Sequence, residues 1–444
     1  MSSVFTDAMK GRGCQMLAGS VRVILYVRLL VFASTVFDLV HYTSWAYEVL
    51  ARRLASVLVV LLLRYWGGGT PAAAKELQGI ASDWSHVVRT AFFCYDASLS
   101  DAFKQGMISA SLWFRYTNYG PFGHIFDLLV VAPVEAPRRL FKLFANRADY
   151  FEPPLSDSEW FHVVGVEAPR CAVFLVAGFG LAIYCEHLVH RYFAHRVFST
   201  SRAWNLVLAA IPCYIAMPPL FFASTHRRHH KYCELEGDPH PVNQKGFLYG
   251  AMFWLADREN FKIREEYIQD WLQERPELLV FEIGQAHFAR WVSYTVVAVL
   301  SIFLAPVWFP DNLWESPFMV AFLTGKQLGM SMVAAFTAFG HTCPFWPACL
   351  PLRWPLARKE ENPQKAQAAE QEGLGPCMST HRWWYWWIAG SESDHDQHHA
   401  CPIYAVYGPW YHDWSYCTYA AMEKCGLVWS VKTPWAKGWK PHSS

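Results

Sequence analysis

The sequence lacks the features that mark several common classes of protein. Its 12 cysteines include no C-x-x-C pair, which argues against a disulfide framework and against a thiolate zinc site. Lys and Arg number 38 and Asp and Glu number 37, so the formal net charge is only +1 and no bulk attraction to nucleic acid is expected. The first residues are mixed and polar, so we expect no cleavable signal peptide. No internal repeat is found.

Apolar residues are abundant instead, and they come in long blocks. The chain of 444 residues is 53% hydrophobic and 17% charged, and a helix needs about 20 apolar residues to cross a membrane. Four blocks meet or approach that length, and they lie at 171–184, 203–223, 289–309 and 318–340. Three shorter or charge-interrupted runs precede them, at 20–40, 54–63 and 122–134. The sequence therefore predicts an all-α integral membrane protein with at least three transmembrane helices, and four to six in total.

The block at 203–223 differs from the others because proline interrupts it. Pro212, Pro218 and Pro219 each remove a backbone donor and clash with the preceding helical turn. We therefore expect a broken or interfacial element and not a straight span. This matters for function, because a straight span would place the polar residues before and after it on opposite sides of the membrane.

Histidines gather at the ends of the apolar blocks. The groups are H-x4-H at His190 and His195, H-x-x-H-H at His226, His229 and His230, a single His341, and a second H-x-x-H-H at His395, His398 and His399. On a helix, residues i, i+3 and i+4 lie within an arc of about 100°, so each H-x-x-H-H presents three imidazoles to one face. Residues five apart diverge by about 140°. His190 and His195 can therefore converge only where the helix ends or distorts.

Eight or nine imidazoles exceed the ligands that one transition metal accepts, and they suit two. Imidazole favours iron, zinc, copper or nickel over magnesium or calcium. Iron fits redox chemistry, and zinc fits a structural or hydrolytic site. His341 taken alone is as well explained by a hydrogen-bonded histidine at the membrane interface as by a ligand.

Acidic residues accompany the histidines. Asp238 follows the first H-x-x-H-H, and Glu392 precedes the second by three residues. A metal-bound histidine usually donates its other ring N–H to a carboxylate or carbonyl, which is one role for these two residues. The alternative role for these two carboxylates is to keep a solvent-exposed surface polar.

Three segments together carry a family resemblance, and they read HRYFAH, HRRHHKYCELEGDPHP and ESDHDQHHACP. In their order and spacing they resemble the membrane fatty-acyl desaturases, specifically the stearoyl-CoA (delta-9) branch. The resemblance covers residues from about 165 to 432. We therefore expect a catalytic domain at 161–432, an N-terminal region at 1–160 with uncertain membrane or interfacial helices, and a tail at 433–444.

The resemblance implies a helical membrane core whose cytosolic helical cap carries a di-iron centre. It implies that an acyl chain, bound as acyl-CoA or acyl-lipid in a membrane such as the endoplasmic reticulum, receives a double bond using O2 and two electrons. By motif, the implied iron ligands are His190, His195, His226, His229, His230, His341, His395, His398 and His399.

The sequence departs from the family pattern at several positions. Thr337 stands where the family has an asparagine that holds a metal-bound water, so Thr337 is expected to hold water in its place. Met217, Ser224 and Thr225 replace polar or charged residues of the acyl-CoA enzymes, which predicts weaker recognition of CoA. Arg258 keeps one basic position of the expected substrate-binding surface. No HPGG haem motif occurs, so a separate electron donor of the cytochrome b5 or ferredoxin type is expected.

Two other classes of function stay open. A hydroxylase or acetylenase would use the same scaffold, because C–H abstraction is shared and only the later steps differ. A non-catalytic membrane protein that binds or transports metal is the second alternative. Transport predicts ionisable residues along a path inside the spans, whereas these histidines lie at span ends.

Overall fold

The computed structural model describes much of the chain beyond residue 168. The described residues are 61, 65, 68–79, 81–82, 168–251, 253–304, 316–341, 388, 392, 395–407 and 413–433. The chain divides into two compact units, residues 1–123 and 124–444, and each is considered by itself. In the first unit, residues 68–79 and 81–82 are helical. The apolar runs at 20–40, 122–134 and nearly all of 54–63 lie outside the described residues, and the boundaries at 160 and 432 stay predictions.

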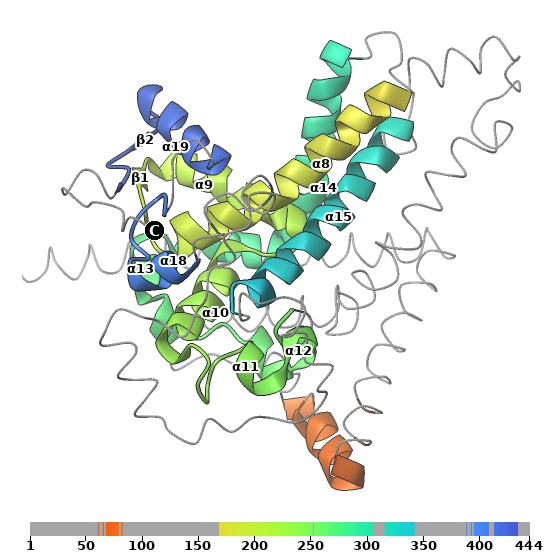
Figure 1. Ribbon diagram of the computed structural model, residues 1–444, viewed down its shortest axis with the longest axis vertical. Helices are drawn as coiled ribbons and strands as arrows, with labels where there is room; N and C mark the ends of the chain where they lie inside the picture. Colours follow the sequence, from red (N-terminus) through yellow and green to blue (C-terminus); the bar gives the residue numbers. More distant parts are fainter. Residues whose placement is uncertain are drawn as a thin grey trace, which may run out of the picture. The chain divides into compact units, whose positions relative to one another are not determined.

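Two long apolar helices run side by side in the second unit (Figure 1). α8 (Ala168–Leu188) continues into the π-helix η3 (Val189–Ala194), and α15 spans Pro317–Phe339. Both are long and apolar enough to cross a membrane. α14 (Leu279–Leu304) packs against both, and its apolar part begins at Phe288. The rest of the span expected at 289–309 lies outside the described residues.

Glycine allows the backbones of α8 and α15 to approach closely. A Cβ atom at Gly178 would lie 2.0 Å from the carbonyl oxygen of Phe322, and one at Gly325 would lie 1.9 Å from that of Leu175. Neither position has room for a side chain. Small residues at helix crossings are a common basis of helix association in membranes, where the hydrophobic effect does not drive helices together.

The proline-interrupted block forms a bent pair of helices, as the sequence predicts. α9 (Arg202–Ala210) and the 3-10 helix η4 (Ile211–Ile215) lead into α10 (Pro219–Tyr232), with a bend of 76°. Ala216 at the bend has φ 60°, in the left-handed region. Counted as one element, this pair is a third candidate span among the described residues.

The start of α10 is stabilised by a residue from another helix. Its N-cap, Pro218, makes no side-chain hydrogen bond. Instead, the fully buried carboxylate of Glu282 in α14 accepts hydrogen bonds from the backbone N–H groups of Leu220 (2.8 Å) and Phe221 (3.3 Å). This contact satisfies the unpaired N–H groups at the helix start and complements the helix dipole.

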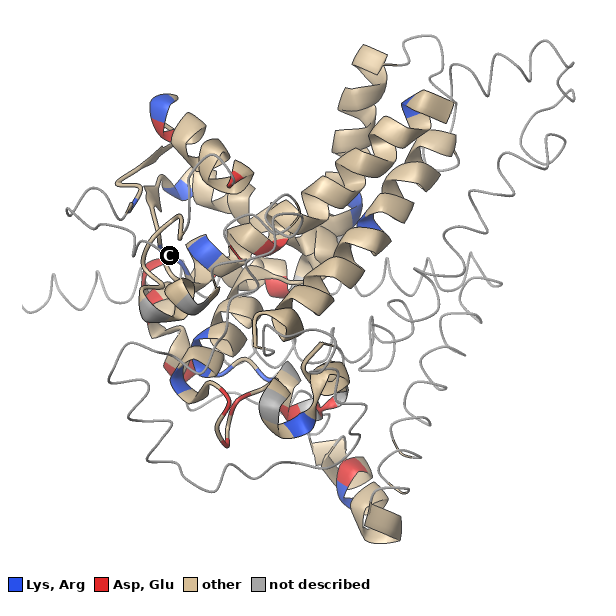
Figure 2. Cartoon of the chain, viewed as in Figure 1, with Lys and Arg blue, Asp and Glu red and all other residues tan. Residues whose placement is uncertain are grey.

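The remaining described elements of the second unit are short. They are α11 (Val242–Lys245), α12 (Phe247–Ala251), η5 (Phe253–Ala256), η6 (Arg258–Phe261), η7 (Glu265–Tyr267), α13 (Gln269–Glu274), η8 (Pro276–Leu278), α18 (His395–Ala400), α19 (Trp414–Lys424), β1 (Ser199–Thr200) and β2 (Val428–Trp429). β1 and β2 pair antiparallel, with Ser199 opposite Trp429. Figure 2 shows few charged residues on α8, α14 and α15 and many more on the short elements near α10 and α11. The prediction of a mainly helical integral membrane protein is confirmed.

Candidate metal centre

The first two histidines converge because α8 changes its geometry. A π-helix is closed by hydrogen bonds between residues i and i+5, so residues five apart lie nearly above one another. The segment η3 covers His190, and His195 is the residue that ends it. Their ring centroids lie 5.5 Å apart. The predicted distortion of the helix is therefore present, and it places both imidazoles on one side.

The structure brings all nine predicted histidines together, in two adjoining groups. The first histidine group consists of His190, His195, His226, His230 and His398, and the second consists of His229, His341, His395 and His399. Within each group the candidate ligand atoms all lie within 4.8 Å of one another. Their role as ligands stays a prediction, but their convergence from separate elements is an observation.

Each H-x-x-H-H motif is divided between the two groups. On α10, residues i and i+4 (His226 and His230) belong to the first group and residue i+3 (His229) to the second. On α18 the division is reversed, because only residue i+3 (His398) belongs to the first group. Seen down the helix axis, residue i+4 lies about 40° from residue i in one direction, and residue i+3 lies about 60° from it in the other. Two such helices facing one another therefore build two sites at once.

The distances between ring nitrogens fit metal coordination. Nε2 of His190 lies 2.7 Å from Nε2 of His398, and Nε2 of His226 lies 3.0 Å from that of His195. In the second group, Nε2 of His395 lies 3.2 Å from Nε2 of His341. Two nitrogens about 2.1 Å from one metal ion and at right angles to each other would be about 3 Å apart. Without a cation, such facing lone pairs repel, so the donor set fits transition-metal binding.

Carboxylates contact the other nitrogen of several rings. Glu392 Oε2 lies 3.2 Å from Nδ1 of His190 and 3.6 Å from Nδ1 of His395, so one carboxylate supports both groups. Both carboxylate oxygens of Asp238 lie 3.0 Å from Nδ1 of His229. These contacts leave Nε2 as the nitrogen with the free lone pair, which is the usual arrangement behind metal-bound histidine. Glu392 and Asp238 thus lie beside these rings, and their role behind a bound metal stays a prediction.

Glu234 gives His341 the same kind of contact. Its Oε1 lies 3.3 Å from Nδ1 of His341, and its backbone has φ 59°. In the sequence Glu234 is one of the acidic residues that follow the first H-x-x-H-H, which makes it a candidate for such a contact, but not with His341 in particular. No local spacing indicates the contact, because His341 lies 107 positions further along the chain, just after α15.

A fully buried arginine holds Glu392 in place. Arg191 Nη2 donates to Glu392 Oε1 at 3.1 Å, and Arg191 Nη1 donates to Asp413 Oδ2 at 2.6 Å and to the carbonyl oxygen of Ala405 at 3.1 Å. Asp413, also fully buried, is the N-cap of α19. A buried charge requires such partners. The network therefore links the histidines to the C-terminal part of the described chain.

Burial favours the uncharged form of three histidines outside the spans. Burial first, and then the neighbouring histidines, lowers the pKa of His195, His398 and His399 well below the usual value for histidine. Burial raises the pKa of Asp238, but His229 and His240 together outweigh this effect, and the net pKa lies well below the usual value for aspartate. Neutral imidazoles beside ionised carboxylates are the protonation states that metal binding requires.

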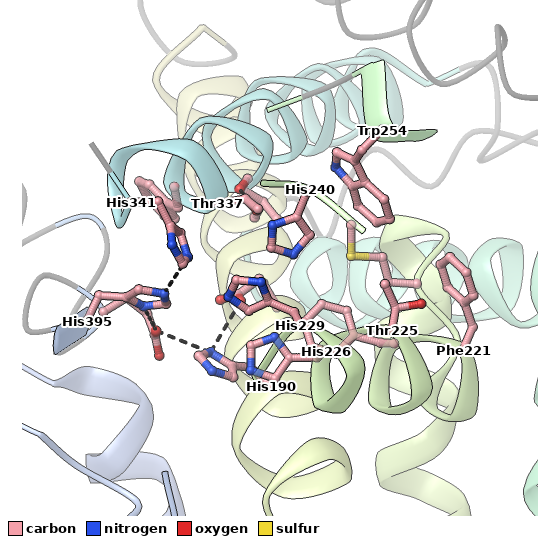
Figure 3. Close-up of a pocket in the computed structure, with 16 residues that line it drawn as sticks. His190, Phe221, Thr225, His226, His229, His240, Trp254, Thr337, His341 and His395 are labelled. Atoms are coloured by element: carbon pink, nitrogen blue, oxygen red, sulfur yellow. Dashed lines mark hydrogen bonds and ion pairs between the residues drawn. The ribbon is translucent and has the colours of Figure 1, made fainter. Parts of the chain in front are cut away.

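A cavity adjoins both groups (Figure 3). Five of the nine histidines line it, namely His190, His226, His229, His341 and His395. The rest of its wall is mainly apolar, with Met217, Phe221, Phe222, Trp254, Val333 and Phe336. A tenth histidine, His240, also lines it.

The two remaining predicted positions are placed differently. Thr337 of α15 lines the cavity, and its hydroxyl donates to the carbonyl oxygen of Val333 at 3.3 Å. Its lone pairs stay available to a water molecule, and its role stays a prediction. Arg258 begins η6, but its side chain lies outside the described residues. Its predicted contact with substrate is therefore not tested.

Comparisons with known proteins agree with this arrangement. The sequence profile of the fatty acid desaturase family matches residues 168–416. Three similar proteins are a hex-5-enoyl-[acyl-carrier protein] acetylenase from Moorena producens (strain JHB), the delta(9)-fatty-acid desaturase fat-5 from Caenorhabditis elegans and the delta-9 acyl-lipid desaturase 1 from Arabidopsis thaliana. They are 26%, 24% and 25% identical over 56%, 48% and 59% of this chain.

These alignments cover different shares of the relatives' own lengths. The matched regions cover 72% of the acetylenase, 56% of the worm desaturase and 73% of the plant enzyme. The family profile itself extends from the start of α8 into α19, more than half of the chain, and includes all nine histidines. The protein therefore belongs to the fatty acid desaturase family.

Proposed function

We propose that the protein is a membrane di-iron desaturase that inserts a double bond into a fatty acyl chain. The observation that carries this proposal is the pair of adjoining histidine groups at the wall of an apolar cavity. The first histidine group would hold one iron and the second would hold the other. Bound iron would activate O2, which together with two electrons would remove two hydrogens from adjacent methylenes.

The overall reaction balances without a further reactant. One saturated –CH2–CH2– unit, one O2, two electrons and two protons yield one –CH=CH– unit and two water molecules. The chain's own residues would bind and orient the substrate. Met217, Phe221, Phe222, Val333 and Phe336 line the cavity, and such side chains contact methylenes and exclude water.

The residues behind the histidines would keep the rings in one tautomer and one orientation. Asp238 accepts a hydrogen bond from Nδ1 of His229, and Glu392 lies 3.2 Å from Nδ1 of His190, so these contacts would leave the lone pair of Nε2 toward the centre of each group. Arg191 and Asp413 would hold Glu392 itself. Displacement of one ring by about 1 Å is enough to impair chemistry of this kind.

We further propose that the substrate is a fatty acyl-CoA or an acyl-lipid. Ser224, which the sequence resemblance implies to lie near the head group, is fully buried, and its Oγ and the backbone of Arg264 exchange hydrogen bonds. It cannot reach a CoA group, which supports the expected weak dependence on CoA. Competition with free CoA tests this expectation, because strong saturable inhibition would contradict it.

Location and electron supply complete the proposal. We propose an endoplasmic reticulum membrane with the histidine groups on the cytosolic side, and a separate donor of the cytochrome b5 or ferredoxin type. Reconstitution with each donor in turn, with O2 consumption as the readout, distinguishes the two. Protease protection of an epitope at the C-terminus in microsomes tests the orientation.

The central experiment is product analysis. The full chain is expressed in cells with a defined lipid composition, and lipid extracts are examined by mass spectrometry for new double bonds. The His229→Ala and His398→Ala variants serve as controls, and both are expected to abolish product. Purified protein should carry close to two irons per chain, whereas tightly held zinc that iron cannot replace would favour a non-catalytic metal-binding protein.

One relative supports a second candidate function. The acetylenase from Moorena producens, by its name, acts on a hex-5-enoyl chain carried by acyl-carrier protein. Acetylenation would start from an alkene in place of an alkane. The same mass spectra decide between the two, because a triple bond lowers the product mass by a further two hydrogens, and a hydroxylase product would instead gain one oxygen.

A further inference from the structure

His240 is a tenth histidine at the cavity wall, outside both histidine groups. It is only 5% exposed. Its ring stacks on that of His229, with centroids 4.2 Å apart and an interplanar angle of 28°. The ring of Trp254 meets it edge-on at 5.4 Å. His240 thus lies against a member of the second histidine group, and it faces the same cavity (Figure 3).

Neither ring nitrogen of His240 has a hydrogen-bond partner among the residues that the structure describes. Nδ1 is buried without one, and Asp238 Oδ1, at 4.0 Å, is too distant for a hydrogen bond. A neutral imidazole offers one donor and one acceptor. A buried polar group of this kind is usually paired with water or a ligand.

The backbone around His240 holds the ring in this position. Its N–H donates to Asp238 Oδ1 at 3.0 Å. The side-chain amide of Asn260 donates to the carbonyl oxygen of Pro239 at 3.0 Å. Asp238 also supports His229, so one carboxylate fixes both stacked rings relative to each other. The unpaired nitrogens are therefore held in place and are not the result of a freely turning side chain.

We propose that His240 holds a small hydrogen-bonding ligand, a water molecule or a small anion that replaces it, in the cavity beside the second histidine group. The second group has four histidines where the first has five, and four imidazoles leave room for a further ligand at a transition metal. The apolar cavity wall, with Phe221 and Trp254, disfavours a large polar ligand. The proposal rests on the proposed function in one respect, namely that the second group binds metal.

Azide is a suitable probe, since it is a small anion that binds transition metals and accepts hydrogen bonds. The full-length protein is loaded with iron, oxidised and titrated with azide, and binding is followed by visible absorption and electron paramagnetic resonance. His240→Phe keeps a flat ring against His229 but removes both nitrogens. His240→Gln restores a donor and an acceptor. Lys245→Met, at an exposed position of α11, is the matched control.

His240→Phe is expected to keep the iron-to-protein ratio of the wild type and to bind azide about tenfold or more weakly, because one hydrogen bond to a charged ligand is lost. His240→Gln is expected to stay within about threefold, and Lys245→Met should be unchanged. Where the Phe variant does not accumulate, His240→Leu provides the same comparison with a smaller side chain.

Unchanged azide affinity in an iron-replete apolar variant would overturn the proposal. Loss of about half the iron would also overturn it, since His240 would then act by packing against His229. The proposed function fails separately, when the wild-type protein binds iron and azide but forms no unsaturated product. If the wild-type protein does not bind azide but still forms unsaturated product, the proposal for His240 is contradicted and the proposed function is not.

Discussion

At the scale of single residues, Glu392 is the side chain on which both histidine groups depend. It contacts His190 and His395 and receives two hydrogen bonds from Arg191. We expect Glu392→Gln to lower iron affinity or activity by about 10- to 100-fold, the usual effect of removing a carboxylate behind a metal-bound histidine. Iron per chain after dialysis against a chelator measures this effect.

The same substitution removes one of the two carboxylates that pair with Arg191. Breaking a buried ion pair costs about 3–5 kcal/mol, so the thermal unfolding temperature should also fall. Glu236→Gln is the matched control, because Glu236 is exposed. Equal iron retention in both variants would show that Glu392 does not support the histidines.

Thr337 gives a second test at this scale. Its hydroxyl lies at the cavity, one helical turn before His341. Thr337→Val keeps the shape of the side chain and removes the hydroxyl. The variant should retain iron, because the hydroxyl is expected to hold a water and not to bind the metal itself. It should slow turnover, because that water loses its partner. Thr337→Asn should be tolerated. Unchanged iron and unchanged rate in the valine variant would exclude a role for the hydroxyl, and full loss of iron would make Thr337 a direct ligand.

At the scale of elements, the contact between α8 and α15 positions the ends of both helices. The backbones approach at Gly178 and Gly325, and each helix leads to a histidine of the centre, His190 on η3 and His341 just after α15. Separation of the helices would therefore move histidines that belong to different groups.

We predict that Gly325→Val forces the helices apart, since a Cβ there would lie 1.9 Å from the carbonyl oxygen of Leu175. Overpacking of this kind costs about 1–3 kcal/mol or more. Thermal unfolding in detergent should show a lower midpoint, together with reduced iron content. Gly180→Ala on α8 is the control, because a Cβ at Gly180 has no neighbour within 4 Å, and it should leave both values unchanged.

At the scale of the whole molecule, metal binding should stabilise the fold. The nine histidines come from η3, α10, α18 and the residues that follow η3 and α15, so one pair of metal ions would join segments that are far apart in sequence. Metal that binds only the folded state contributes about 4 kcal/mol at 1,000 times its Kd. Removal of iron by a chelator should therefore lower the unfolding temperature, and added iron should restore it. An unchanged unfolding temperature would contradict metal-linked stability.

Several features of the fold could be read from local sequence. Helical spacing indicated that each H-x-x-H-H forms one face, and the five-residue spacing of His190 and His195 indicated a distortion that the structure contains as η3. Proline indicated the break between η4 and α10. These inferences succeeded because backbone geometry within one helix depends on residues only a few positions apart.

Other features depend on contacts that no local pattern encodes. Asp413 pairs with Arg191 across 222 positions, and Glu282 caps α10 across 62. Both residues looked like ordinary acidic side chains in the sequence. His240 was likewise indistinguishable from an unremarkable histidine until its ring was seen against His229 and the cavity.

The sequence by itself determined the class of the protein and the chemistry that its histidines favour, because apolar length, helical periodicity and imidazole donors are properties of short segments. The full set of nine histidines followed from the family resemblance. The tertiary structure decided which histidine belongs to which group and which carboxylate supports which ring. It also decided what faces the cavity. Those outcomes depend on the angle at which α10 and α18 meet and on the close approach of α8 and α15, and such geometry arises only when distant segments pack together.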